Sequence, residues 1–173
     1  MNLEERVAEL EQRISRLEAA DRGGAEPAAA RTDPAQDDFW ALTAWKQQLA
    51  AAGIDGGGVL YTGAVRLPSG ERYEWQLGLD TEGLLAGDLG SAAETLAALG
   101  NPVRLLLLRE VLLGRNTVSA LAEVADLGTS GQVYHHLRQL TAAGWLHTVV
   151  RGRYAVPPDR VVPLLVALAV ARR

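Results

Sequence analysis

Hydrophobic residues recur at helical spacing between residues 117 and 143 and predict two consecutive helices. A turn at residues 126–128 separates them, because a glycine there supplies the positive φ that ends a helix. In the second helix, Thr129 and Gln132 have the spacing of a capping box, in which each side chain satisfies a free backbone N–H. The predicted buried face repeats at i, i+4 and i+7 and consists of Val133, Leu137 and Leu140.

Two short apolar runs after this helix predict a small β-hairpin. Residues 145–150 and 153–156 can pair across Arg151 and Gly152. Helix, turn, helix and hairpin in this order form a winged helix-turn-helix, in which the second helix enters the major groove of DNA.

Three further helices are predicted around this segment. A capping box at Ser91 opens a helix to residue 99, and Asn101 caps the next one, which runs to residue 113. After the hairpin, Asp159 is the predicted cap of a last helix that ends near residue 171. Pro163 then falls in or near its first turn, where a missing N–H matters little.

The middle of the chain predicts one helix and one hairpin. The helix covers residues 37–52, and the strands, residues 59–67 and 71–79, join at residues 68–70. Apolar residues alternate along the second strand, so one face is predicted to be buried. A lone hairpin is only marginally stable, and the helix is its expected partner in a small α+β unit.

The first twenty residues carry an alternating 4, 3 spacing of apolar residues that is typical of a coiled coil. β-branched residues at a and leucine at d favour a parallel pair of helices. The alternative is an amphipathic helix packed on its own subunit. The seam consists of Leu3, Val7, Leu10, Ile14 and Leu17.

The complete pattern predicts an α+β protein that is mainly α. A chain of 173 residues suits one or two small domains with a real core. The predicted segments are a coiled-coil helix (1–20), a flexible linker rich in Ala, Gly and Pro (21–36), a helix plus β-hairpin unit (37–89) and a winged helix-turn-helix domain for DNA binding and dimerisation (90–173).

Charge is distributed unevenly along the chain. Residues 1–89 hold 8 Lys+Arg and 16 Asp+Glu, and residues 90–173 hold 9 Arg and 5 Asp+Glu, which together give the net charge of −4. The basic half is the one with the DNA-binding pattern, where arginines can neutralise phosphates. An acidic first half also fits a second interpretation, a protein-interaction module in which the winged helix and the coiled coil bind a protein partner.

Cysteine is absent, which excludes disulfides and thiolate chemistry and fits a cytoplasmic protein. The charged start lacks the apolar region of a signal peptide. The longest apolar run, residues 161–170, is too short to span a bilayer. We therefore expect a cytoplasmic protein that makes no membrane contact.

Two motifs resemble the ArsR-type winged-helix transcriptional regulators. Residues 96–108, Leu-Ala-Ala-Leu-Gly-Asn-Pro-Val-Arg-Leu-Leu-Leu-Leu, resemble the opening of that family. Residues 134–140, Tyr-His-His-Leu-Arg-Gln-Leu, followed by residues 143–146, Ala-Gly-Trp-Leu, resemble its recognition helix and the start of its wing. The resemblance covers about residues 90–170, and it implies a homodimer that binds double-stranded DNA and regulates transcription.

The resemblance implies base contacts by exposed residues near the start of the recognition helix. Gln can bond adenine through two atoms, Ser can bond bases or phosphate, and Arg can reach guanine or phosphate. Two arginines at the hairpin tip suit phosphate or minor-groove contacts. The alternative is a solvated helix face and turn, with Tyr134 packed against the wing. The candidate DNA-binding residues are Thr129, Ser130, Gln132, Tyr134, His135, Arg138, Arg151 and Arg153.

Dimerisation is the second implication. ArsR-like dimers use the first and last helices of this domain, and here both carry more apolar surface than one small winged helix can cover. The candidate residues are the five of the heptad seam with Leu96, Leu165 and Leu168. A two-fold dimer would read an inverted repeat.

Metal sensing, which many members of the family perform, is not expected here. The family's cysteine pair would fall near Thr117 and Ser119, and neither is a thiolate. The last helix also lacks the His and acidic ligands of the other metal site. No nucleophile–base set or phosphate-binding loop stands out, so we expect no metal, no cofactor and no enzymatic activity.

Aromatic residues concentrate between residues 37 and 89. Aromatic-lined hollows are the usual form of small-molecule sites, so these rings are a candidate pocket for a small-molecule effector. The alternative is that they fill a small core or cover a dimer contact. The candidate residues are Trp40, Trp45, Tyr73 and Trp75.

Overall fold

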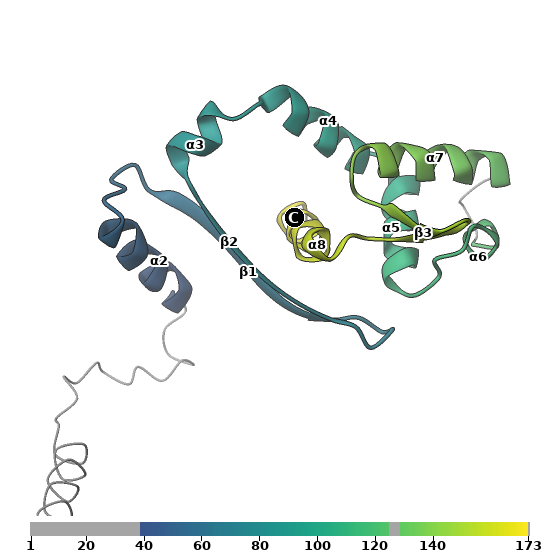
Figure 1. Ribbon diagram of the computed structural model, residues 1–173, viewed down its shortest axis with the longest axis horizontal. Helices are drawn as coiled ribbons and strands as arrows, with labels where there is room; N and C mark the ends of the chain where they lie inside the picture. Colours follow the sequence, from purple (N-terminus) through teal and green to yellow (C-terminus); the bar gives the residue numbers. More distant parts are fainter. Residues whose placement is uncertain (1–38, 125–128, 173) are drawn as a thin grey trace, which may run out of the picture. The chain divides into compact units, whose positions relative to one another are not determined.

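A computed structural model describes residues 39–124 and 129–172. Over these ranges the protein is mixed α+β and mainly helical, with seven helices, a long β-hairpin and a second small sheet (Figure 1). The chain divides into two compact units, Met1–Ala44 and Trp45–Arg173. The predicted coiled coil, the linker and the turn at residues 126–128 lie outside the described residues. No helix in the described ranges is long and apolar enough to cross a membrane.

The predicted helix over residues 37–52 is confirmed as α2 (Trp40–Ala51). Its Leu49 is buried, Trp45 is half-buried and Trp40 is exposed.

The predicted hairpin is also confirmed, as β1 (Gly58–Arg66) and β2 (Arg72–Asp80) in antiparallel register. Its turn is set by local chemistry. The Leu67 N–H donates to the Glu71 carbonyl at 2.9 Å, and Gly70 has a φ of 93° that residues with a Cβ rarely adopt.

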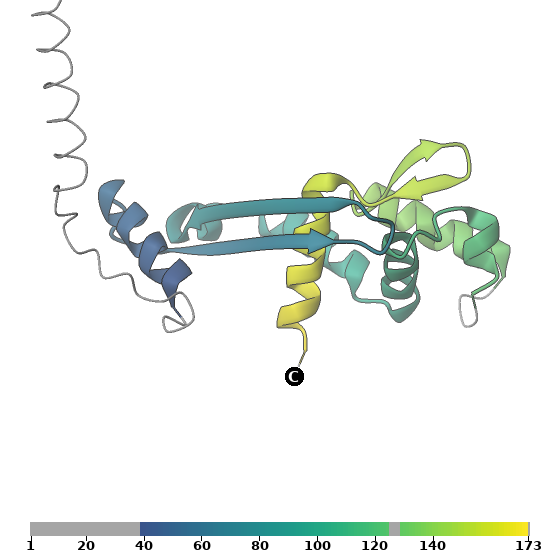
Figure 2. The same ribbon diagram turned by 90° about the horizontal axis from the view of Figure 1, so that it is seen from below.

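The two faces of this hairpin have different partners. On one face, α8 (Pro158–Val170) packs against both strands (Figure 2). The contact is so close at Gly63 that an added Cβ would lie 2.7 Å from Val162 Cγ1. On the other face, near the strand ends, the ring of Trp45 lies beside Gly58 and Gly78, where an added Cβ would lie 3.0 Å and 2.5 Å from the indole.

The expectation that the apolar face of the hairpin packs on the 37–52 helix is therefore wrong. Tyr73 on that face packs against the core that the later helices form. The physical reason is that α8 has its own apolar surface to bury. At the far end of the strand, Leu79 was expected to be buried but is 39% exposed.

Two helices follow the hairpin, and aspartates set where both begin. α3 (Thr81–Ala86) was not predicted; the carboxylate of Asp80 caps it by accepting from the Gly83 N–H at 2.6 Å. α4 (Leu89–Leu99) begins before the expected capping box at Ser91. The Asp88 side chain accepts from the N–H groups of residues 90 and 91, so the helix starts there instead.

The next helices begin as predicted. α5 (Pro102–Leu112) is capped by Asn101, whose side chain accepts from two N–H groups of the first turn at 3.0 and 3.2 Å. α6 (Val118–Ala122) is short and has Thr117 as its cap. α7 (Ser130–Ala142) carries the complete capping box between Thr129 and Gln132.

A second small sheet, β3 (His147–Val150) and β4 (Arg153–Ala155), follows α7. Its antiparallel pairing confirms the second predicted hairpin, with an irregularity between Thr148 and Val150. Trp145, which was expected to open the first strand, instead precedes it and is buried, with its indole N–H donating to the Thr95 carbonyl at 2.9 Å. That bond fastens the end of α7 to α4.

The last helix begins at Pro158 and not at an Asp159 cap. Its N-cap is Pro157, with no side-chain cap bond, and Asp159 lies in the first turn. Proline at the first helical position is already in helical φ, so the helix can start there without a side-chain cap. Pro163 consequently lies inside the helix and not in its first turn.

One core holds α5, α6, α7 and α8 together. Burying one such leucine or valine side chain is worth about 1.5–3 kcal/mol, so a handful of them dominates the stability of a small domain. The side chains with no exposed surface are Leu107, Leu121, Val133, Leu137, Leu140, Val161 and Leu164.

Candidate nucleic-acid interface

One face of α7 is buried in the core, and the opposite face is exposed to solvent. The three predicted core residues of this helix have 0% exposed surface. The helix is thereby fixed on one side, and its other side is free to contact a partner. The exposed residues there are Ser130, Gly131, Gln132, Tyr134, His135 and Arg138.

The capping box limits what Gln132 can do. Its Oε1 accepts from the Thr129 backbone N–H at 2.8 Å and also lies 3.2 Å from the Thr129 hydroxyl. A two-atom contact with adenine needs both the oxygen and the nitrogen of the amide. Because the oxygen is already occupied, only the amide NH₂ of Gln132 is available without opening the cap. The hydroxyl of Thr129 is likewise engaged, which makes it a positioning residue.

The adjacent histidines of α7 occupy different environments. His135 is exposed, whereas His136 is half-buried, and their ring centroids lie 5.5 Å apart in an edge-on arrangement. Burial lowers the pKa of His136, and the nearby charges of His135 and Arg104 lower this pKa further. Its buried Nδ1 has no hydrogen-bond partner among the described residues. Its surroundings therefore favour the uncharged form of His136, and of the two histidines His135 is the one exposed to solvent.

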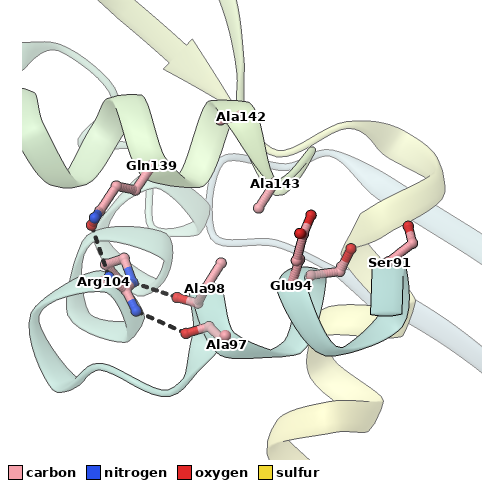
Figure 3. A pocket seen from close by; sticks show the side chains of 9 residues that line it. Ser91, Glu94, Ala97, Ala98, Arg104, Gln139, Ala142 and Ala143 are labelled. Carbon is pink, nitrogen blue, oxygen red and sulfur yellow. Dashed lines mark hydrogen bonds between the residues drawn. The ribbon is translucent and has the colours of Figure 1, made fainter. Parts of the chain in front are cut away.

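Arg104, on α5, ties α7 to α4, a role that the sequence does not predict. Its Nη1 donates to Gln139 Oε1 at 2.8 Å, its Nε donates to the Ala98 carbonyl at 2.5 Å and its Nη2 donates to the Ala97 carbonyl at 2.8 Å (Figure 3). The residues that form these bonds line a cavity of about 460 Å³ between α4 and α7, and Glu94 also lines it. The only signal in the sequence was the arginine of the Asn-Pro-Val-Arg motif.

The β3–β4 hairpin is fastened to the start of α6. The Val118 N–H donates to the Gly152 carbonyl at 3.1 Å, and the Tyr154 N–H donates to the Asn116 carbonyl at 2.9 Å. Arg151 and Arg153 are exposed at its tip. Because the backbone beneath them is hydrogen-bonded to α6, the two arginines are held on the same rigid body as α7.

The charged side chains of α7 and of the β3–β4 hairpin are all basic. Residues 129–156 contain three arginines and neither Asp nor Glu. Nearby, Glu110 is buried and its carboxylate pairs with Arg109 at 2.8 Å and Arg115 at 3.3 Å. That carboxylate is thus screened by its own cations.

The dimer candidates differ in exposure. Leu96 on α4 is 61% exposed. Leu165 and Leu168 on α8 are half-buried and pack against the core on one side. The five residues of the heptad seam lie outside the described residues.

The four aromatic pocket candidates do not line one hollow. Trp40 is exposed, and the ring of Trp45 lies against glycines of the hairpin. Tyr73 borders a hollow of about 220 Å³ and Trp75 a different, open one of about 380 Å³. In the part of the chain that the structure describes, no group of three His, Cys, Asp or Glu side chains is placed to hold a metal ion.

No protein-family model, curated protein or solved structure matches the chain.

Proposed function

We propose that the protein is a homodimeric, DNA-binding transcriptional regulator with a winged helix-turn-helix domain. The single observation that carries this proposal is the two-sided character of α7. Three residues of one face have no exposed surface, while the other face presents amide, phenol, imidazole and guanidinium groups to solvent. Those are groups that bond base edges and phosphates in the major groove.

The β3–β4 hairpin supports the same function as the wing. Its two exposed arginines lie on a backbone that is bonded to the start of α6. With α7 in the major groove, arginines in such a hairpin contact the flanking phosphates or the minor groove. The absence of acidic residues between residues 129 and 156 favours a polyanionic partner over a protein.

The dimer follows from the exposed leucine of α4 and from the heptad seam of the sequence. Leu96 is 61% exposed on α4, the helix that the resemblance assigns to dimerisation, so we place the apolar contact with a second copy there. Two α7 helices related by a two-fold axis would read an inverted repeat with half-sites about one helical turn apart or a multiple of it. The resemblance of two motifs to the ArsR-type regulators supports this arrangement.

A salt series with sheared genomic DNA tests the proposal. Binding of the full-length protein, measured by an electrophoretic shift, should weaken steeply as salt rises, because each neutralised phosphate adds about −0.9 to the log–log slope. The variant Arg151→Ala/Arg153→Ala should show a shallower slope. The matched control is Arg66→Ala/Arg72→Ala, which removes the same charge from exposed positions of the other hairpin.

The control should bind DNA as the wild-type protein does. If the protein binds no DNA even at low salt, the function as a DNA-binding regulator is excluded. The protein-interaction module would then be the better interpretation.

A further inference from the structure

A hollow of about 220 Å³ lies where the β1–β2 hairpin meets the core beneath the wing. Its apolar wall comes from α5, β4 and α8 and includes Val111, Val156 and Val161. Two tyrosines from the two hairpins, Tyr73 of β2 and Tyr154 of β4, also line it. We refer to it as the tyrosine hollow. Its position depends on the docking of the hairpin on α8, so residues far apart in the sequence build it.

One carboxylate lies at the rim of the tyrosine hollow. Glu71 Oε2 accepts from the Ser69 hydroxyl at 2.9 Å, and its carboxylate is near enough to the Tyr73 phenol to affect the pKa of Tyr73. Burial raises the pKa of Tyr73, and the negative charge of Glu71 raises this pKa further. The phenol therefore stays protonated and neutral, and the single negative charge at the rim is unpaired by any cation among the lining residues.

We infer that the tyrosine hollow binds a small organic cation with a single-ring or short aliphatic body, of the arylalkylamine class. A cavity of about 150 Å³ is enough to bind benzene, so this hollow has room for one ring and a short side chain. The valines and ring faces take the apolar body. Glu71 takes the ammonium group, and aromatic faces add to the attraction for a cation.

Two residues that line the tyrosine hollow also form a hydrogen bond between the wing and the segment before α6. The Tyr154 N–H donates to the Asn116 carbonyl at 2.9 Å, and both residues line the hollow. A molecule between β2 and β4 would therefore contact the joint between the wing and the start of α6. This step rests on the function proposed above. A molecule bound in the tyrosine hollow should change the affinity for DNA by about five-fold or more, as is common for coupled sites.

Fluorine NMR of the full-length protein labelled with 3-fluorotyrosine tests binding without DNA. The chain has four tyrosines, so four resonances can be assigned by Tyr→Phe variants. Benzylamine is the probe, and its dissociation constant should be about millimolar because it has few atoms. The resonances of Tyr73 and Tyr154 should move and saturate together, while those of Tyr61 and Tyr134 stay in place.

Two controls define the chemistry. Benzyl alcohol has the same shape without the charge and should bind the wild-type protein about ten-fold more weakly than benzylamine does. Benzylamine should also bind the Glu71→Gln variant about ten-fold more weakly than it binds the wild-type protein. Glu74→Gln, on the exposed face of the same strand, should leave the titration unchanged. No saturable shift, or equal shifts at all four tyrosines, would overturn the site. Equal affinity for amine and alcohol would overturn the cation class. Because this measurement uses no DNA, its failure is distinct from failure of DNA binding.

Discussion

The guanidinium of Arg104 and the side-chain amide of Gln139 are joined by a hydrogen bond of 2.8 Å between α5 and α7. The other N–H groups of Arg104 go to the last carbonyls of α4, which form the negative end of that helix dipole. One cation thus holds together the helix proposed to form the dimer and the helix proposed to read DNA.

Arg104→Ala should lower the free energy of unfolding by about 2 kcal/mol, because three hydrogen bonds donated by a charged group are lost. Arg104→Lys should recover only part of this loss, since one ammonium cannot reproduce the forked geometry. Urea unfolding followed by tryptophan fluorescence measures both variants. Gln139→Ala, which removes only the bond between helices, should lose less than about 1 kcal/mol. Equal stability of wild type and Arg104→Ala would show that this arginine holds nothing.

Arg138→Ala should weaken binding to an operator selected from random sequences by about ten-fold, which corresponds to a lost base or phosphate contact. Its stability should not change, because the side chain is exposed.

Gln132→Ala is expected to behave differently from Arg138→Ala. It opens the capping box and should lower the free energy of unfolding by about 1 kcal/mol. The matched control is Thr129→Ala, which removes the other side chain of the same capping box. Competition binding to the same operator compares the two. If Gln132→Ala weakens DNA binding no more than Thr129→Ala does, the amide reads no base.

Leu96→Asp should convert the dimer to a monomer at micromolar concentration. Symmetry removes the leucine from both sides of the interface, so the dimer should be weaker by about a hundred-fold or more. Leu113→Asp is the control, because Leu113 is also exposed, at 49%, but lies at the end of α5. Light scattering gives the mass, and circular dichroism checks the fold. Deletion of residues 1–20 should weaken the dimer without abolishing it. A wild-type protein that is already monomeric would contradict the prediction.

The parts of the fold that depend on neighbours in sequence are the parts that the sequence predicts well. Asn101 and Pro102 open α5, and the box from Thr129 to Gln132 opens α7, because each cap needs only two or three residues. Residues 80–90 are the exception. The sequence does not predict α3, which Asp80 caps, and it places the start of α4 at Ser91 although the cap is Asp88, because this segment has no clear apolar period.

The candidate sites divide in the same way. The exposed face of α7 follows from helical periodicity, so its residues are predictable from the sequence. The tyrosine hollow is not predictable, because Tyr73 and Tyr154 meet only when β2 docks beside β4. The role of Arg104 is not predictable either, because one of its acceptors, Gln139, is 35 residues away in the sequence.

His136 should make stability fall as pH drops below the usual histidine pKa of about 6.5. Burial lowers its pKa in the folded state below the usual value of 6.5. The unfolded chain then binds a proton at a higher pH than the folded protein does. Its contribution is therefore fully present above about pH 6.5 and is lost as pH falls below that value. Urea unfolding at several pH values should show a decline that His136→Gln reduces. His147→Gln, at an exposed position, should leave the decline intact. A slope unchanged in His136→Gln would exclude this group as its source.

The close contact between Gly63 and Val162 gives a direct test of whether the β1–β2 hairpin docks on α8. In an isolated strand, replacing glycine by alanine is stabilising by about 0.5–1 kcal/mol. Here the new Cβ would lie 2.7 Å from Val162 Cγ1, and overpacking of this kind is destabilising by about 1–3 kcal/mol. Gly63→Ala should therefore lower the free energy of unfolding. The control is Gly56→Ala, where no atom lies within 4 Å of the new Cβ.

The double variant Gly63→Ala/Val162→Ala separates docking from a general effect on the strand. Val162 is 1% exposed, so Val162→Ala alone should be destabilising through the cavity that it leaves. In the double variant the added methyl occupies part of that space. The combined loss should then be smaller than the sum of the two single losses, by about 1 kcal/mol or more. Strict additivity in urea unfolding would mean that the two residues do not touch, and the hairpin would have to lie elsewhere.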